Sequence, residues 1–398
     1  MRIPPMAVIA ALAACGRFGY SPSDGDGAPE GGDADAISPR ILCGDTGGLA
    51  PSAPWPVIHG CPTNAGRSAF LGPATGSTAV GPLGAADGPR GAVVGSDRRI
   101  FLQEYRSGTI WAFDATTGGQ AWTNSDLSGA NYQAYPAVGA GNVLYVTTSY
   151  GLIAAFDTVT GAKTWELQLS GAYSAPVLSS AGTLYFGSLS PWGFYAVDTK
   201  THAQAWHYDV PADGDAGTAP AVGEDKVYFV DIMNSRLYAL DAATGAHVFD
   251  VAVPGGAIGS PVLGVGAVYV ATSSNGIAAI DPESGALRWQ LPPSLSVVQP
   301  ALLANGDVVS CTVEGNVFVL DRTTGVERLL APVGSPPIGP PIVDAADTIY
   351  IPTWTGTRAY LASTGALVWQ SSLGGTIVAA DGALVVLPDL ERFAIIGP

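Results

Sequence analysis

The sequence has little charge and few basic residues. Charged residues make up 13% of the 398 positions, and 17 Lys and Arg stand against 33 Asp and Glu, so the formal net charge is −16. Proteins bind nucleic-acid backbones and anionic membrane surfaces through basic patches, and this sequence contains no run of Lys or Arg. We therefore expect no nucleic-acid partner and no electrostatic attachment to anionic lipid.

Cysteine and histidine are also scarce, with four of each. Neither a Cys-x-x-Cys motif nor a Cys/His cluster with zinc spacing occurs, and the histidines are scattered along the chain. The sequence also lacks a Gly-x-Ser-x-Gly motif and a phosphate-binding loop. We therefore predict no metal site and no catalytic residue.

The N-terminal apolar stretch, residues 6–14, is too short to cross a bilayer as a helix. It ends in Leu12-Ala13-Ala14-Cys15, which matches the signal of bacterial lipoproteins. We predict a signal peptide over residues 1–14 and lipidation of Cys15; an ordinary secretory peptide with an incidental Cys15 is the alternative. Gly16, rather than Asp, follows the cysteine and favours the outer membrane, so the chain is expected to be an outer-membrane lipoprotein on the periplasmic face or at the cell surface.

Residues 15–50 are predicted to form a disordered acidic tether. Five carboxylates stand among Gly, Ala and Pro between residues 21 and 36 without a single base, and such a segment cannot bury enough apolar area to fold. Cys43 and Cys61 flank a Pro-rich loop, and an oxidising compartment favours a disulfide between them. Cys311 lies in an alternating apolar run and is expected to be a buried free thiol.

Residues 51–398 contain an internal repeat. Its signature is two apolar residues, Asp, then Gly, and an aromatic residue four positions after the Gly; successive Asp positions differ by 43, 41, 43, 40 and 40. In the last copy Leu361 takes the place of the Asp. The repeat residues that we expect to be structural are Asp114, Gly118, Trp122, Asp157, Gly161, Trp165, Asp198, Trp206, Asp241, Gly245, Asp281, Gly285, Trp289, Asp321, Gly325, Gly365 and Trp369.

Each repeat contains four short strand-like runs, which is typical of one propeller blade. The Asp is expected to accept hydrogen bonds from the next backbone N–H groups, the Gly to supply a positive φ, and the Trp to pack against the neighbouring blade. Three further runs follow Trp369, and the run over residues 76–83 would complete them as a fourth strand. We therefore predict an all-β, eight-bladed propeller of four-stranded antiparallel blades closed by strands from both termini; seven blades is the alternative.

The repeats resemble the pyrroloquinoline-quinone (PQQ) β-propeller family, whose pattern is Ala-x-Asp-x-x-Thr-Gly-x-x-x-Trp. Ala239, Asp241, Thr244 and Gly245 match it. The segment over residues 55–68 is similar to the lead-in of stand-alone members. Two branches of this family suggest different functions for the chain. Quinoprotein dehydrogenases use an adjacent Cys-Cys pair, which this sequence lacks; the other branch is the non-catalytic propeller lipoprotein of the outer-membrane β-barrel assembly machine.

These observations favour a lipid-anchored, non-catalytic propeller without a cofactor. It would act as a protein-interaction scaffold or an envelope assembly factor, and its partner would be another envelope protein or an extended polypeptide. A PQQ-dependent dehydrogenase and a sugar-binding or sensory propeller are the alternative interpretations.

Overall fold

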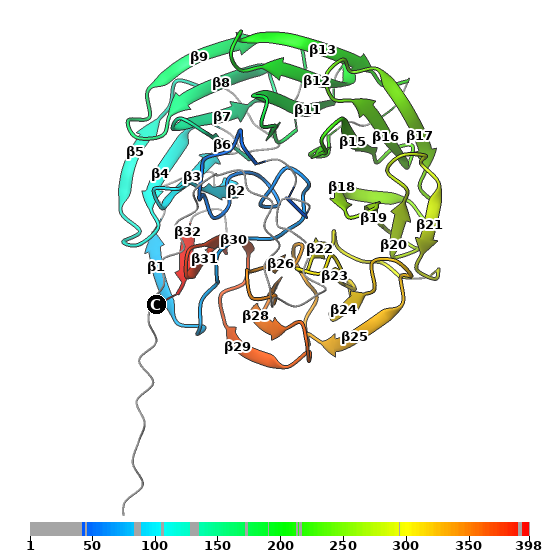
Figure 1. Ribbon diagram of the computed structural model, residues 1–398. Coiled ribbons are helices and arrows are strands. Elements are labelled where there is room, and N and C mark those ends of the chain that lie inside the picture. Colours follow the sequence, from blue (N-terminus) through cyan, green and yellow to red (C-terminus); the bar gives the residue numbers. More distant parts are fainter. Residues whose placement is uncertain are drawn as a thin grey trace, which may run out of the picture. The chain divides into compact units, whose positions relative to one another are not determined.

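The computed structural model describes residues 42–43, 46–82, 89–104, 107–127, 135–171, 174–189, 191–211, 214, 217–293, 295–388 and 392–397. All of them belong to one compact unit, residues 36–398. Within these ranges 32 strands form eight four-stranded sheets, which stand as blades around a central axis (Figure 1). The predicted eight-bladed propeller is confirmed, and the seven-blade alternative is wrong.

Blades 1 to 7 each use four consecutive strands, with the first strand innermost. Blades 1 to 3 comprise β2 (Pro89–Val94), β3 (Arg99–Glu104), β4 (Ile110–Asp114) and β5 (Gln120–Asn124); β6 (Ala137–Gly139), β7 (Val143–Thr147), β8 (Leu152–Asp157) and β9 (Lys163–Gln168); and β10 (Val177–Leu178), β11 (Thr183–Leu189), β12 (Trp192–Asp198) and β13 (Ala203–Asp209).

The next four blades repeat this order. Blades 4 to 7 comprise β14 (Ala221–Val222), β15 (Lys226–Asp231), β16 (Arg236–Asp241) and β17 (His247–Ala252); β18 (Ala257–Gly264), β19 (Ala267–Thr272), β20 (Ile277–Ile280) and β21 (Leu287–Gln290); β22 (Ala301–Leu302), β23 (Val308–Cys311), β24 (Asn316–Leu320) and β25 (Glu327–Pro332); and β26 (Ile342–Val343), β27 (Thr348–Thr353), β28 (Gly356–Leu361) and β29 (Leu367–Ser371).

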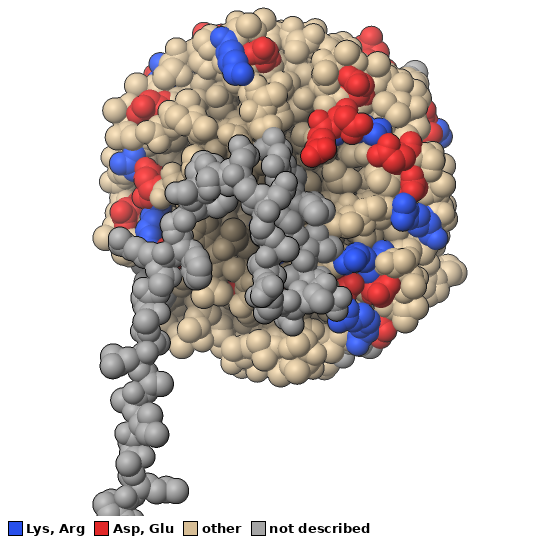
Figure 2. Space-filling model, viewed as in Figure 1, with Lys and Arg blue, Asp and Glu red and all other residues tan. Residues whose placement is uncertain are grey.

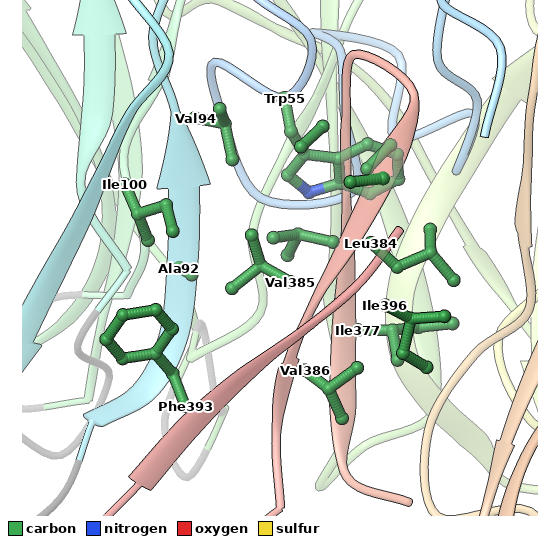
Figure 3. Packing of buried hydrophobic residues seen from close by; sticks show 14 of the residues in the cluster. Trp55, Ala92, Val94, Ile100, Ile377, Leu384, Val385, Val386, Phe393 and Ile396 are labelled. Atoms are coloured by element: carbon green, nitrogen blue, oxygen red, sulfur yellow. The ribbon is translucent and has the colours of Figure 1, made fainter. Parts of the chain in front are cut away.

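Blade 8 joins the two ends of the propeller sequence. Its inner strands are β30 (Thr376–Ala380), β31 (Ala383–Leu387) and β32 (Arg392–Ile396), and its outer strand is β1 (Thr78–Pro82), which pairs antiparallel with β32. Figure 3 shows the resulting core, in which Phe393 of blade 8 lies beside Ala92 of blade 1. This closure completes the ring, so blade 8 packs against blade 1 as well as blade 7.

The Asp of each repeat organises the turn between the third and fourth strands. In blade 6, Asp321 Oδ1 accepts hydrogen bonds from the backbone N–H groups of Thr323 (3.0 Å) and Thr324 (2.8 Å) and from Thr324 Oγ1 (2.8 Å). Gly325 then adopts a φ of 70°, which residues with a side chain rarely adopt. These hydrogen bonds stabilise the charged carboxylate and lower the pKa of Asp321.

The Trp of one blade packs on the turn of the next. Trp206 is buried and donates a hydrogen bond from Nε1 to the Ala242 carbonyl at 3.0 Å. Its ring lies over Gly245, where a Cβ would come within 2.6 Å of the indole. The repeat Gly therefore also serves as a flat platform for the neighbouring Trp. Trp122 with Gly161 and Trp289 with Gly325 repeat this contact.

Strand direction separates the connections into two faces. Hairpins between the second and third strands of each blade emerge at one end of the axis, which we call the hairpin face. Turns between the first and second strands, and the Asp turns between the third and fourth, emerge at the opposite end, which we call the Asp-turn face. This division follows from the antiparallel order in every blade.

Candidate functional site

A segment without regular strands fills part of the propeller axis. We call this segment, residues 46–71, the axial plug. Its backbone carbonyls accept hydrogen bonds from the innermost strands of several blades. These hydrogen bonds are Val138 N to Pro56 O (2.7 Å), Val222 N to Pro62 O (2.7 Å), Leu263 N to Thr63 O (2.9 Å), Leu302 N to Ala65 O (2.8 Å) and Val343 N to Gly66 O (2.8 Å). The plug thus satisfies inner-edge donors that would otherwise face the channel.

One plug side chain connects three inner carbonyls. Asn64 is fully buried, and its Nδ2 lies 2.9 Å from the Pro261 carbonyl, 3.0 Å from that of Pro220 and 3.4 Å from that of Ala219. Asn64 has a φ of 59°, a conformation that Asn tolerates better than most residues. The side chain therefore joins the inner strands of blades 4 and 5 through the plug.

The plug occupies the Asp-turn half of the axis. Its carbonyls of Gly48, Phe70 and Leu71 accept hydrogen bonds from Ala140, Ala345 and Gly382, which lie in turns between first and second strands. Leu49 is buried, and so is Leu42. The packed unit therefore begins before residue 51, where the sequence placed the end of the tether.

A small pocket remains on the axis at the hairpin-face end of the plug. It is a cavity of about 140 Å³, floored by Trp55, Ile58 and His59 of the plug and walled by residues such as Ile338 and Ile377. Burial lowers the pKa of His59 to about 4, because a charged imidazolium is poorly solvated there. The floor is therefore neutral at physiological pH.

The pocket does not fit the quinone that the fold family implies. That cofactor is a multi-ring polycarboxylate, and its binding needs cationic side chains and a site wider than one benzene-sized cavity, which is about 150 Å³. None of the described residues lining the axial pocket is Lys, Arg, Asp or Glu. The pocket therefore offers neither the charge for the quinone nor the carboxylates for a calcium ion.

The hairpin face carries exposed large apolar side chains. Trp354, Met233 and Tyr150 are 77%, 71% and 63% exposed, and each lies at a hairpin between a second and a third strand. Trp192 and Val313 are exposed at the corresponding positions of blades 3 and 6. A turn position normally favours Gly, Asn, Asp or Ser, so the fold does not require these side chains. These exposed side chains make the hairpin face the candidate binding surface.

The Asp-turn face carries most of the ion pairs. Lys226 Nζ lies 2.8 Å from Glu283 of the next blade and 3.0 Å from Asp225, and the hydrogen bond with Glu283 raises the pKa of Lys226. Arg98 pairs with Asp381 of blade 8 at 2.6 Å. In Figure 2 acidic and basic side chains lie beside one another near β15–β17 and β24–β25. The charges of Lys226 and Arg98 are therefore paired within the protein.

Cys43 and Cys61, for which the sequence predicts a disulfide, lie next to each other as thiols. A hydrogen bond with Cys61 and burial raise the pKa of Cys43, and Cys61 also lies 3.4 Å from Thr63 Oγ1. The pair joins the chain that leads into the plug to the plug itself, and its oxidation to a disulfide stays a prediction. Cys311 is a buried thiol.

The remaining sequence predictions fall in different places. The repeat Asp, Gly and Trp residues lie in turns and between blades rather than at the axis, and Cys15 lies outside the described residues. No cluster of three or more His, Cys, Asp or Glu side chains suited to a metal ion occurs in the part of the chain that the structure describes. In that same part, no helix has the length and apolarity needed to cross a membrane.

Sequence reasoning missed the plug and the exposed hairpin residues. The plug has no period-two alternation, and its signal is a run of Gly, Pro, His and Asn beside buried apolar residues. The signal for the hairpins is the occurrence of Tyr150, Trp192 and Trp354 where turn residues are expected.

The fold and the site define a class: an eight-bladed propeller of PQQ-type repeats with a plugged axis and an apolar hairpin face. Comparison with protein families identifies the group within that class. The family model described as outer membrane protein assembly factor BamB matches residues 106–229 and 194–352, and the chain belongs to this family. The outer membrane protein assembly factor BamB of Burkholderia pseudomallei is 26% identical over 297 residues, which cover 69% of this chain and 75% of that protein.

Solved structures agree on the fold. BamB from Moraxella catarrhalis superposes with a TM-score of 0.56 at 17% identity, covering 80% of this chain and 96% of that one. Quinohemoprotein alcohol dehydrogenase from Comamonas testosteroni superposes with a TM-score of 0.64 at 12% identity, covering 91% of this chain and 82% of that one. Similarity at this level of identity shows a common fold and nothing about a common reaction.

Proposed function

We propose that this chain is a lipid-anchored, non-catalytic propeller that binds another envelope protein during outer-membrane protein assembly. Family membership supports the assembly role. The observation that carries the proposal is the contrast between the two faces: the hairpin face exposes the large side chains of Trp354, Met233 and Tyr150, whereas the apolar residues exposed at the Asp turns are the smaller Val159 and Val326, beside internal ion pairs.

The axis supports a non-catalytic role. Enzymes of this fold need an axial site for their cofactor, and here the plug takes up one half of the axis while the remaining pocket lacks charged lining among the described residues. We infer that binding, rather than chemistry, is the function of the hairpin face.

Attachment to the outer membrane would come from Cys15. The motif Leu12-Ala13-Ala14-Cys15 supports lipidation, and residues 16–41 would then join the anchor to the propeller. The Cys15→Ser variant should move from the membrane fraction to the soluble fraction. Unchanged membrane association of that variant would contradict the anchor while leaving the binding proposal intact.

The binding role is tested by affinity purification of the intact chain from detergent-solubilised envelopes. A Tyr150→Ser/Trp354→Ser variant removes two exposed aromatic groups of the hairpin face. A Val159→Ser/Val326→Ser variant is the matched control, because both valines are exposed at Asp turns on the opposite face. We expect the first variant to lose a co-purifying envelope protein that the control retains. Equal recovery from both variants would contradict the proposal.

A further inference from the structure

The axial pocket lies between the plug and the inner strands of blades 7, 8 and 1, toward the hairpin face. Its walls come from residues at the hairpin-face ends of inner strands: Pro341 precedes β26, Thr376 begins β30, and Pro352 lies near the end of β27. Trp354, the most exposed of the large hydrophobic residues, follows Pro352 by two positions. The pocket therefore lies at the same end of blade 7 as the exposed Trp354.

The size and lining of the pocket define what it can hold. Four isoleucines, Ile58, Ile338, Ile342 and Ile377, line it together with the Trp55 ring. A dry apolar cavity of about 150 Å³ in another protein binds benzene, and this cavity has a volume of about 140 Å³. One aromatic ring therefore matches the space, and an ionised side chain would lose its hydration without gaining a charged partner.

The charge around the pocket limits which residues can flank the aromatic ring in a bound segment. The net charge of the chain is −16, so an acidic segment would be repelled over a long range. On the hairpin side, Asp209 and Glu314 are exposed, whereas Arg236 is paired with Asp250, and Arg358 is half-buried and donates a hydrogen bond to Thr353 Oγ1. Neutral or basic flanks are therefore favoured.

We propose that the axial pocket receives one phenylalanine side chain from an extended segment of a partner polypeptide with neutral or basic flanks. The exposed hairpin residues contact the segment on either side of this anchor. The inference rests on the proposed protein-binding function and specifies the residue class that the hairpin face recognises. In many protein interfaces a few buried aromatic residues supply most of the affinity. One ring inserted into this pocket would have that role.

The lining isoleucines allow a direct test. The full chain is labelled at its isoleucine methyl groups and titrated with a blocked pentapeptide that has a central phenylalanine flanked by serine and then lysine. Ring currents from the bound phenylalanine should shift the methyl resonances of Ile58, Ile338, Ile342 and Ile377. These shifts should reach a plateau as the peptide concentration rises. A pentapeptide with alanine at the centre should bind roughly tenfold more weakly or worse, because it buries far less apolar area.

Two variants locate the binding at the pocket. Gly339 lines the pocket, and a Cβ there would meet only Pro352 at 3.7 Å, so Gly339→Leu should fill the space and abolish the titration. Ile338→Ala removes part of one wall and should weaken binding severalfold in a protein that still folds. Val326→Ser, on the opposite face, should bind the peptide as the wild type does.

Several results would overturn the proposal. These are equal affinity for the peptides with phenylalanine and with alanine at the centre, unchanged peptide binding by the Gly339→Leu variant, or equal affinity for a peptide with glutamate in place of lysine. Phenylalanine amide binding as tightly as the pentapeptide would mean that the pocket takes a small aromatic molecule instead. If the envelope partner is captured while these methyl resonances stay unmoved by the peptide, the pocket inference fails and the protein-binding function stands.

Discussion

The two faces of this propeller use the same kind of residue for opposite purposes. At Trp206 the indole is buried between blades, and its Nε1 is hydrogen-bonded to the next turn; at Trp354 the indole is 77% exposed on a hairpin. Charged residues follow the reverse distribution, since the ion pairs gather at the Asp-turn face. The comparison teaches that the repeat motif stabilises the fold at one face and leaves the sequence of the other face free to vary, and we propose that the binding residues lie on that other face.

The largest effect should come from the buried member of this comparison. Trp206→Ala removes an inter-blade side chain and its hydrogen bond, so we expect it to lower the free energy of unfolding by about 3–5 kcal/mol. Trp354→Ala should change that free energy by less than about 0.5 kcal/mol. Urea denaturation of both variants checks the contrast, and similar losses would show that Trp354 also supports the fold.

The second-largest loss of stability should come from a substitution in the axial plug. Asn64→Ala leaves the carbonyls of Pro220 and Pro261 without their side-chain donor, and we expect a loss of about 2–3 kcal/mol. Asn142→Ala is the matched control, because Asn142 has a similar φ of 62° at an exposed turn. Equal destabilisation of the two variants would attribute the loss to backbone conformation and not to the plug.

The pocket floor should make stability depend on pH. The pKa of His59 is lowered to about 4 in the folded chain and is about 6.5 in an unfolded one, so the unfolded state binds more protons between these values. Stability from this residue is therefore present above pH 6.5 and lost as the pH falls toward 4, by at most about 1.4 kcal/mol per pH unit. His59→Asn keeps a residue suited to the left-handed backbone and should flatten this slope in urea titrations between pH 5 and 7; an unchanged slope would contradict it.

The turns should show the smallest effects, in opposite directions. Asp321→Ala removes three hydrogen bonds and should cost about 1 kcal/mol. Blade 7 has Leu361 at the equivalent position, with Gly365 already at a φ of 70°, so Leu361→Asp should stabilise the protein by about 0.5 kcal/mol. Thermal denaturation distinguishes the two, and destabilisation by Leu361→Asp would mean that the exposed leucine has a packing role.

The part of the molecule that sequence predicted well is the part governed by local rules. Asp321, Gly325 and the repeat Trp residues recur because blades 1 to 7 share the same turn and packing requirements, so their spacing predicted these seven blades. The strand-like runs after Trp369 and over residues 76–83 predicted the eighth blade and the closure. The plug was not predicted, because Asn64 finds its partners 155 to 197 positions away and no local pattern encodes such contacts. The exposed Trp354 was also missed, since the sequence alone does not separate a buried indole from an exposed one.

The central claim is that the hairpin face, and not the Asp-turn face, contacts the partner. It is tested most directly by placing a photoreactive amino acid at position 354 or at position 326 of the intact chain and irradiating whole envelopes. The account predicts a discrete protein adduct from position 354, weakened by Tyr150→Ser, and none from position 326. Adducts from position 326 alone, or the same adduct from both positions, would contradict it.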